Sequence, residues 1–261
     1  MQIKFLGTYS GESKQHKLLT FIIDDILVVE AASISSELTF PEQRAIKAIL
    51  LSHCHYDHVC GLPAFAFNSA QNGGCETCAE VLALPQTLQM LTDHFFNEVI
   101  YPNFTKDTSY LGKPSIKFRP IEACKGVYID DYRVTALPAT HTPDATGFEI
   151  VSPDAKSVFY TGDTGPGFAH VWERISPQLV ITETTFPDRL YQVALASGHL
   201  CPKTLEQELG KFKKMKGYLP KVIVVHMNPQ FEKEICKETG KVGERLSIPI
   251  TIAREGDIYS L

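Results

Sequence analysis

Three histidines and an aspartate fall within six residues of this chain, in the run His53-Cys54-His55-Tyr56-Asp57-His58. The whole sequence of 261 residues holds only nine histidines, and packing alone gives no reason to crowd three of them together. Residues two apart in an extended segment project to the same side, so His53 and His55 could bind one cation together. Asp57 and His58 would face a second cation as the chain turns, and these ligand types suit Zn(II), Fe(II) or Mn(II). The run therefore predicts a dinuclear metal site.

Short apolar runs followed by turns recur along the chain, and together with helical patterns between them they predict an α/β fold. The first seven residues alternate like a strand, and Leu205, Leu209 and Phe212 share one face of a predicted helix over 203–214. Pro202 suits the first turn of that helix. The other predicted strands are 20–24, 26–30, 46–52, 132–138, 157–161, 179–182, 221–225 and 250–253.

Four candidate ligands come directly after predicted strands, namely His53, His141, Asp163 and His226. Their positions suggest that the ligands converge at one edge of the sheets. Asp163 lies between glycines in Gly162-Asp163-Thr164-Gly165, where a carboxylate could bridge two metals. A turn capped by the aspartate is the structural alternative, but the histidine run makes the metal interpretation the stronger one.

Charge and hydrophobicity limit the partners of the chain. There are 25 Lys and Arg against 30 Asp and Glu, and the one basic cluster, 211–216, lies on a predicted helix. A protein that binds a long nucleic acid normally needs a broader basic surface. We therefore expect no long nucleic acid as a partner. No stretch approaches the roughly 18 apolar residues of a membrane span, and the N-terminus does not resemble a signal peptide. We therefore expect a cytoplasmic protein that does not bind membranes.

The chain has seven cysteines, an odd number that argues for reduced thiols rather than a disulfide framework. Cys75 and Cys78 have the spacing of a metal or redox pair, but no second pair completes a structural zinc site. Ordinary loop thiols are the favoured interpretation, and a thiol switch is the alternative.

The order of the candidate ligands resembles that of the metallo-β-lactamase superfamily. The resemblance rests on His-x-His-x-Asp-His at 53–58, on His141, on the Gly-Asp-Thr-Gly turn at Asp163 and on the strand-terminal His226. It implies one domain over 1–261 with a four-layer αββα sandwich fold. It also implies two divalent metal ions, the first held by His53, His55 and His141. The second would be held by Asp57, His58 and His226, with Asp163 bridging both.

Three further stretches resemble a narrower group, the class II cyclic nucleotide phosphodiesterases. Residues 93–104 resemble that group's helical insertion with its aromatic-Pro-Asn-Phe sequence. Glu183-Thr184-Thr185-Phe186-Pro187 resembles its Glu-Cys-Ser-Phe-Pro, and Gly198-His199-Leu200-Cys201-Pro202 resembles its Gly-His-Leu-Thr-Pro. The resemblance implies hydrolysis of 3′,5′-cyclic nucleotides such as cAMP and cGMP to 5′-monophosphates through a metal-bridging hydroxide.

This interpretation gives roles to further residues. His199 is the candidate proton donor to the leaving oxygen, because it lies just before a helix whose N-terminus favours anions, and Glu183 would orient it. Asp57 completes the expected catalytic set. A histidine at a helix start without a role is the alternative for His199.

The segment 62–112 lacks the regular spacing of short apolar runs seen elsewhere and is rich in helix-prone and aromatic residues. It is also long for a connection between strands, and such segments often form a cap over a site. We expect His94, Asn97 and Tyr101 to contact the substrate, with Tyr101 stacking on a base. Packing within the cap is the alternative for His94 and Tyr101. Exposed aromatic residues there would also suit a homodimer contact.

The chain departs from the superfamily pattern at three places. Glu30-Ala31-Ala32 stands where Asp-x-Gly is usual, so a carboxylate supporting the metal ligands would reach from one methylene further out. Gly167 replaces an acidic residue, and Cys201 replaces a threonine that would cap the following helix. Because of these departures, the substrate preference and the residues that support the metal ligands could differ from those of the family.

Other functions fit the same ligands. A tRNA 3′-processing nuclease is disfavoured by the net charge of -5 and by the lack of a basic, Gly/Pro-rich arm. A lactonase does not explain the cap or the Gly-His-Leu stretch. A non-hydrolytic di-iron protein that binds oxygen or senses redox state is the alternative from another class. A small-molecule phosphodiester remains the expected substrate.

Overall fold

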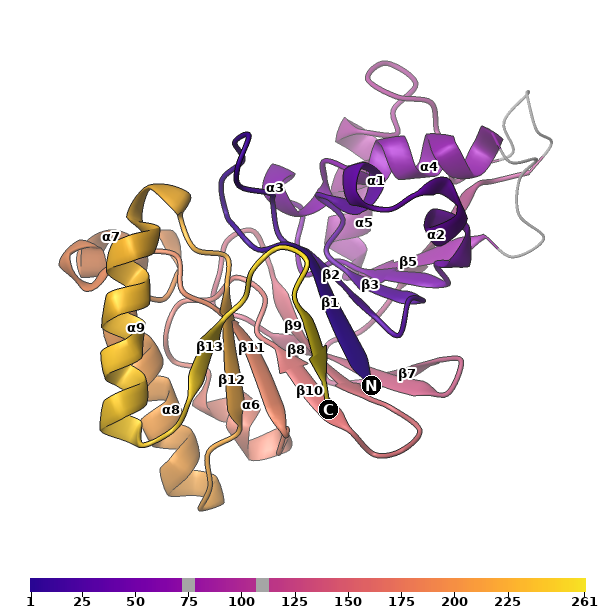
Figure 1. Cartoon of the computed structure of the whole chain (residues 1–261). Helices are drawn as coiled ribbons and strands as arrows, with labels where there is room; N and C mark the ends of the chain where they lie inside the picture. The colour runs from indigo at the N-terminus through magenta and orange to yellow at the C-terminus, as the bar shows by residue number, and fades with distance from the viewer. Residues whose placement is uncertain (72–77, 107–112) are drawn as a thin grey trace. The chain divides into compact units, whose positions relative to one another are not determined.

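The structure, a computed structural model, describes residues 1–71, 78–106 and 113–261. These residues form two compact units, each built around its own mixed sheet of seven strands (Figure 1). The first unit comprises Met1–Gly7, Lys17–Glu122 and Glu255–Leu261, and the second comprises Thr8–His16 and Ala123–Arg254.

The sheet of the first unit has the strand order β14-β1-β2-β3-β4-β5-β6. Its first four strands pair antiparallel and the rest pair parallel. Strands β2, β3 and β4 are buried along their whole length, as expected of apolar strands inside a covered sheet. The strands are β1 (Gln2–Gly7), β2 (Thr20–Ile23), β3 (Leu27–Val29), β4 (Ala48–Leu50), β5 (Ala79–Ala83), β6 (Ile116–Pro120) and β14 (Ile258–Ser260).

Five helices accompany this sheet among the residues that the structure describes. Their apolar side chains join those of the strands in one core that includes Phe65, Leu88 and Phe96. Helix α3, one of two four-residue helices described, contains the end of the histidine-rich run and therefore determines where the side chain of His58 points. The helices are α1 (Ile34–Glu37), α2 (Phe40–Ala45), α3 (Tyr56–Val59), α4 (Leu62–Gln71) and α5 (Pro85–His94).

The sheet of the second unit has the order β13-β12-β11-β10-β9-β8-β7, with parallel pairing from β13 to β10 and antiparallel pairing from β10 to β7. The parallel strands β10, β11 and β12 thus end at the same edge, and the residues after them meet there. The strands are β7 (Gly126–Ile129), β8 (Tyr132–Pro138), β9 (Thr146–Val151), β10 (Ser157–Tyr160), β11 (Leu179–Glu183), β12 (Lys221–Val225) and β13 (Ile250–Ile252).

Helices α6, α8 and α9 cover one face of this second sheet (Figure 1). Trp172 on α6 is buried between Phe159 of the sheet and Phe212 of α8, which fixes how these helices pack. The helices of the unit are α6 (Ala169–Arg174), α7 (Tyr191–Ser197), α8 (Pro202–Lys216) and α9 (Glu232–Leu246), with short 3-10 turns at Asp188–Leu190 and Pro229–Phe231.

Most elements match the predictions from the sequence. Every predicted strand is present with its ends at most two residues from the predicted ones, and the predicted helix at 203–214 is α8, which begins at Pro202. Among the residues that the structure describes, no helix has the length and apolar character needed to cross a membrane.

The segment 62–112, for which we predicted a helical cap, contributes strand β5 to the first sheet. This strand pairs with β4 on one side and β6 on the other, so that part of the segment is not a cap. The run Ala79-Glu80-Val81-Leu82-Ala83 has few β-branched residues, which is why its pattern does not predict a strand. A cap role for the rest of the segment, and a single domain over the whole chain, stay predictions.

Candidate metal centre

The first unit gathers three imidazoles where β4 leads into α3. Two residues separate His53 from the end of β4. His55 directly precedes α3, and His58 lies within α3. Nε2 of His53 and Nδ1 of His55 are 2.9 Å apart, and the rings of His53 and His58 lie 4.2 Å apart, centroid to centroid. Two nitrogens on one tetrahedral cation, with metal bonds of about 2.1 Å, would be about 3.4 Å apart. The two nitrogens here are closer, at hydrogen-bond distance, so a small movement apart would let them share one cation.

A buried carboxylate supports these histidines. Glu30 directly follows β3, has a positive φ of 60°, and places Oε1 3.3 Å from Nδ1 of His58, with both side chains fully buried. Its other oxygen accepts a hydrogen bond from the Ser52 amide at 3.4 Å, and the Ser52 hydroxyl lies 2.9 Å from Nδ1 of His53. A carboxylate behind a histidine is how proteins orient metal-binding imidazoles. Glu30 thus lies where the departure from Asp-x-Gly predicts it.

Asp57 and Cys54 complete this part of the chain in different ways. The Asp57 carboxylate is partly exposed in the first turn of α3, and Oδ2 lies 3.7 Å from Nε2 of His58. Burial raises the pKa of the Cys54 thiol. A protonated thiol is a poor metal ligand, so we do not count Cys54 among the candidate ligands.

The second unit gathers a second set of metal-binding side chains at the edge where its parallel strands end. Asp163 follows β10, His226 follows β12, and His199 precedes α8. Each offers one ligand atom, and these three atoms lie within 4.8 Å of one another. Asp163 Oδ1 is 3.4 Å from Nδ1 of His226, and its Oδ2 is 4.0 Å from Nδ1 of His199. Asp163 and His226 are almost fully buried.

His199 is held by Glu183, the last residue of β11. Nδ1 of His199 lies 2.8 Å from Oε1 of Glu183, a side chain with no exposed surface. The same carboxylate accepts hydrogen bonds from the Thr164 and Thr185 amides at 3.0 and 3.1 Å and from the Thr185 hydroxyl at 2.7 Å. A carboxylate with four donors is saturated as an anion, so Glu183 can stabilise a positively charged imidazole.

His141 is oriented by the backbone at the end of α7. Its Nδ1 lies 3.0 Å from the carbonyl oxygen of Gly198, and its ring centroid is 4.9 Å from that of His199. Gly198 has a φ of 69°, and a Cβ there would lie 3.0 Å from Nδ1 of His141. Glycine at 198 therefore gives His141 the room it needs beside His199.

The structure thus brings together the predicted ligands of each unit. In the first unit these are His53, His55, Asp57 and His58, and in the second they are His141, Asp163 and His226 beside the predicted catalytic pair. Their assignment to two shared metal ions stays a prediction. A role for Thr185 was missed, although a hydroxyl two residues after a strand-terminal glutamate is the signal that could have found it.

The three residues predicted to contact substrate lie at and after the end of α5. His94 is exposed at the last position of the helix. The Asn97 side-chain oxygen accepts hydrogen bonds from the amides of Val99 and Ile100, which gives it a structural role in the turn. Tyr101 packs its ring 5.9 Å from that of Phe104. Substrate contacts by these residues stay predictions.

The two remaining departures are compensated locally. The Gly167 amide, at a φ of 108°, donates a hydrogen bond of 2.9 Å to the buried carboxylate of Glu208 on α8. The amide of Cys201 donates to the hydroxyl of Thr204 at 2.8 Å, so a threonine three residues later replaces part of the missing cap. Cys78 lies with Sγ 3.0 Å from the carbonyl oxygen of Pro114, while Cys75 lies outside the described residues.

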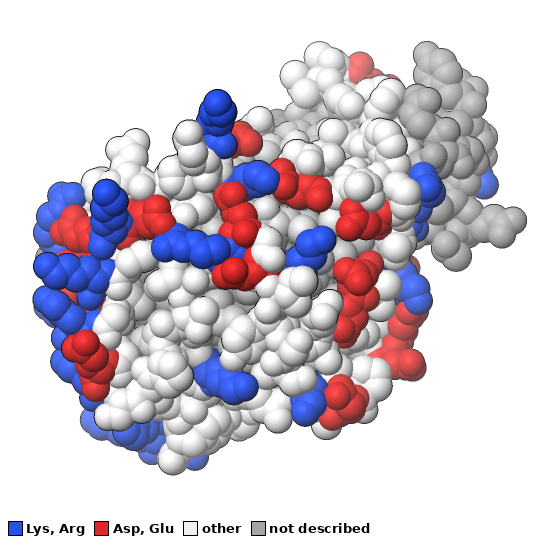
Figure 2. Space-filling view, viewed as in Figure 1, with Lys and Arg blue, Asp and Glu red and all other residues white. Residues whose placement is uncertain are grey.

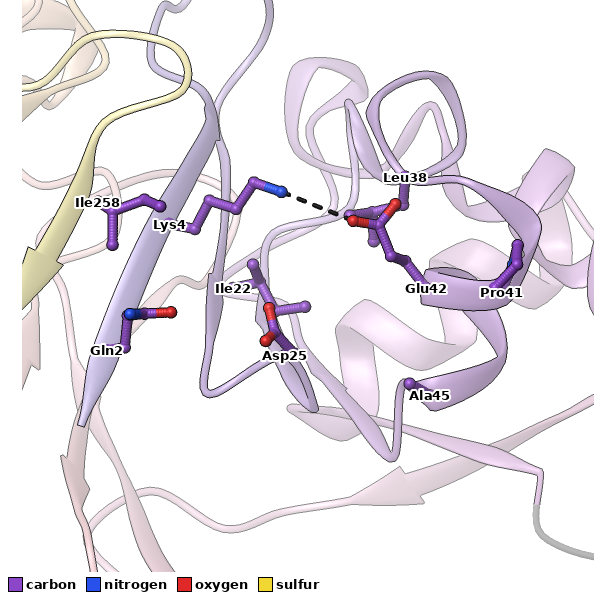
Figure 3. Close-up of a pocket in the computed structure, with 9 residues that line it drawn as sticks. All are labelled: Gln2, Lys4, Ile22, Asp25, Leu38, Pro41, Glu42, Ala45 and Ile258. Atoms are coloured by element: carbon purple, nitrogen blue, oxygen red, sulfur yellow. Dashed lines mark ion pairs between the residues drawn. The ribbon is translucent and has the colours of Figure 1, made fainter.

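A separate pocket of the first unit lies between β1, β14 and α2 (Figure 3). Lys4 points across it toward Glu42, with 3.6 Å between Nζ and Oε1. Its other walls are largely apolar, and its lining among the described residues includes no histidine or cysteine. A surface ion pair of this kind contributes little to stability, and nothing about it indicates catalysis. The histidine clusters therefore stay the candidate site.

Comparison with known proteins identifies the family. Residues 28–245 match the family model described as the beta-lactamase superfamily domain. A "Probable 3′,5′-cyclic-nucleotide phosphodiesterase" of Yersinia pestis is 23% identical over 82% of this chain and 68% of its own length. A "Ribonuclease Z" of Leuconostoc mesenteroides is 25% identical over 59% of this chain and 49% of its own length. The chain therefore spans only about half of that second relative.

Solved structures show the same fold. The structure of unliganded yeast PDE1 matches with a TM-score of 0.82 at 16% identity, over 100% of this chain and 99% of that one. Identity this low concerns the fold alone, and it confirms the αββα sandwich predicted from the sequence. The chain belongs to the metallo-β-lactamase superfamily of hydrolases, and within it resembles the class II cyclic nucleotide phosphodiesterases.

Proposed function

We propose that this hydrolase is a metal-dependent phosphodiesterase that converts 3′,5′-cyclic nucleotides, cAMP or cGMP, to 5′-nucleoside monophosphates. The observation that carries the proposal is the His199 and Glu183 pair, which lies beside the metal-binding side chains Asp163 and His226. Expulsion of a ribose oxygen from phosphorus needs a proton donor next to the site that holds the phosphate. A hydrolase whose leaving group needs no proton would have little use for this pair.

The donor atoms suit two divalent cations, with Zn, Fe or Mn as the candidates. We propose the ligand sets that the superfamily resemblance implies. These are His53, His55 and His141 for one ion, and Asp57, His58 and His226 for the other, with Asp163 shared. When bound, such ions supply Lewis acidity and lower the pKa of water to near neutrality.

The side chains of the chain itself then act on the substrate. His199 donates the proton to the leaving oxygen, and the Glu183 carboxylate at 2.8 Å stabilises the imidazolium before the transfer. Asp57 keeps part of its carboxylate exposed and lies beside His58, so we propose it as the third catalytic residue.

A pocket beside His141 offers space for the rest of the substrate. Its volume is about 580 Å³, and Thr140, Thr142 and Ser197 contribute to its polar lining. Small-molecule sites fall in the range of about 300–1,000 Å³, so the pocket suits a single nucleotide. We further propose that His94, Asn97 and Tyr101 contact the base or ribose.

The ribonuclease Z relatives make an RNA phosphodiester the second candidate substrate. The face in Figure 2 mixes acidic with basic side chains, and the basic ones at its left edge lie over α8 and α9. Two basic side chains of these helices are paired with acids: Lys211 of α8 lies 2.6 Å from Glu208, and Arg245 of α9 lies 2.6 Å from Glu206. This distribution favours a small-molecule phosphodiester over a long nucleic acid as the substrate. A cytoplasmic setting is part of the proposal.

A substrate panel tests the proposal. The metal-loaded protein is incubated with cyclic AMP, cyclic GMP, a tRNA precursor with a 3′ trailer, and a homoserine lactone, and products are quantified by chromatography. We expect 5′-AMP or 5′-GMP to form with the highest kcat/KM of the panel. Faster cleavage of the tRNA precursor would replace the proposal with the nuclease, and lactone hydrolysis alone would contradict both.

Glu30→Gln tests the support of the metal ligands. The substitution keeps the size of the side chain but removes the charge that faces Nδ1 of His58 at 3.3 Å. Loss of such a carboxylate typically lowers metal affinity about 10- to 100-fold, and we expect this loss in titrations against a chromophoric chelator. Glu80→Gln, which removes only a surface pair with Arg119, is the matched control. Equal affinities for both variants would refute this role of Glu30.

A further inference from the structure

We infer that the Thr185 hydroxyl is a positioning group that fixes the tautomer and orientation of His226, and assists Glu183 in doing so for His199. The inference rests on the proposed metal-dependent function, because it concerns which imidazole nitrogen is presented to a cation. Thr185 follows β11 by two residues and is almost fully buried.

The contacts of this hydroxyl connect three functional side chains. Oγ1 of Thr185 lies 2.7 Å from Oε2 of Glu183, 3.0 Å from Nδ1 of His226 and 3.3 Å from Nδ1 of His199. It also lies 3.0 Å from the carbonyl oxygen of His226. The Thr185 hydroxyl oxygen thus contacts the Glu183 carboxylate and the rings of both His199 and His226.

Counting protons decides the direction of these hydrogen bonds. A hydroxyl has one proton and a carboxylate anion has none, so the 2.7 Å contact with Glu183 requires the Thr185 proton. The Thr185 oxygen then acts as acceptor toward Nδ1 of His226, which must itself carry a proton. His199 also faces the saturated carboxylate of Glu183 through Nδ1, so its Nδ1 carries a proton as well.

The consequence is a defined presentation of both rings. With a proton on Nδ1, the lone pair of a neutral imidazole lies on Nε2, which is then the atom able to bind a cation or exchange a proton. His226 follows β12 with a strained φ of 56°, and its amide donates to the carbonyl oxygen of Thr8. The backbone and the Thr185 hydroxyl thus orient the same ring from two sides.

A purely structural role for Thr185 predicts something different. Its amide donates hydrogen bonds to Oε2 of Glu183 and to the carbonyl oxygen of Leu200, each at 3.1 Å. The main-chain amide of Thr185 donates both bonds, so they hold the turn after β11 without the Thr185 side chain. Substituting the side chain therefore separates the positioning role from the support of the turn.

The test compares Thr185→Val, which has nearly the same shape without the hydroxyl, with Thr185→Ser, which keeps it. Thr184→Val is the matched control, because the Thr184 hydroxyl is equally buried but donates only to the backbone oxygen of Glu183. Long-range proton–nitrogen NMR spectra of the metal-free proteins report which histidine nitrogen is protonated. Zn(II) affinity is measured by competition with a chromophoric chelator.

We expect the unsubstituted protein, Thr185→Ser and Thr184→Val to show Nδ1-protonated His226 and the same Zn(II) affinity. Thr185→Val should lose the defined tautomer of His226 and bind Zn(II) about 10- to 100-fold more weakly, as when a group that supports a metal ligand is removed. An Nε2-protonated His226 in the unsubstituted protein overturns the inference, and so does Thr185→Val with unchanged affinity.

If Thr185→Val does not fold, the spectrum of the unsubstituted protein still tests the inference, because Nε2-protonated His226 would contradict it. Neither readout requires hydrolysis of any substrate. A protein that shows the expected tautomer and affinities but hydrolyses no cyclic nucleotide would therefore contradict the proposed function and leave the role of Thr185 standing.

Discussion

Asp163→Ala is expected to lower kcat/KM for cyclic AMP about a thousandfold, because bound cations supply several kcal/mol of transition-state stabilisation and each 1.36 kcal/mol is a factor of ten. The Asp163 carboxylate is buried 3.4 Å from the ring of His226, and it is the one carboxylate in the close group it forms with His199 and His226. Its loss should also reduce the metal content of the purified protein, measured by inductively coupled plasma mass spectrometry.

The matched control for Asp163→Ala is Asp131→Ala, which removes an exposed carboxylate in the turn between β7 and β8. The control should retain the metal content and kcat/KM of the unsubstituted protein. If Asp163→Ala kept full metal content and activity, Asp163 would be a turn residue and its proposed role as a shared ligand would be wrong.

His199→Ala is expected to lower kcat for cyclic AMP by about 10²- to 10⁴-fold, the usual contribution of a general acid. Metal content should stay unchanged, because His199 is proposed as a proton donor rather than as a ligand. The defect should shrink for bis(p-nitrophenyl) phosphate, since nitrophenolate leaves without needing a proton. Steady-state kinetics with both substrates and metal analysis check these expectations.

His170→Ala is the control for this variant, because His170 is an exposed histidine on α6. A loss of metal in His199→Ala would show that His199 is a ligand, which its place in the group with Asp163 and His226 makes the specific alternative. Equal defects with both substrates would remove it from leaving-group protonation.

The sequence predicts the parts of the site that are local or that follow strands. His53 and His55 lie two apart in an extended segment, so their convergence follows from backbone geometry. Asp163 and His226 follow parallel strands, whose ends meet at one edge of a sheet. The pairing of His199 with Glu183 was predicted from the resemblance of their motifs, and the structure places the two side chains 2.8 Å apart.

Other features depend on packing that no local pattern reveals. The contact of Glu30 with His58 joins residues from two different strand ends, and its 3.3 Å separation depends on the positive φ of Glu30. The position of Thr185 after Glu183 is a local signal for a contact with that carboxylate, but only the tertiary structure brings the rings of His199 and His226 to its hydroxyl. Strand β5 is defined by its two neighbours in the sheet more than by its own residues.

The most direct test of the central claim is metal-dependent turnover of cyclic AMP. The protein is stripped with a chelator, titrated separately with Mn(II), Zn(II) and Fe(II), and assayed for 5′-AMP after each addition. Formation of 5′-AMP should be absent in the stripped protein and should rise with bound metal until both proposed sites are filled. Metal-replete protein that forms no 5′-AMP with any of the three ions, or stripped protein that forms it at full rate, would contradict the account.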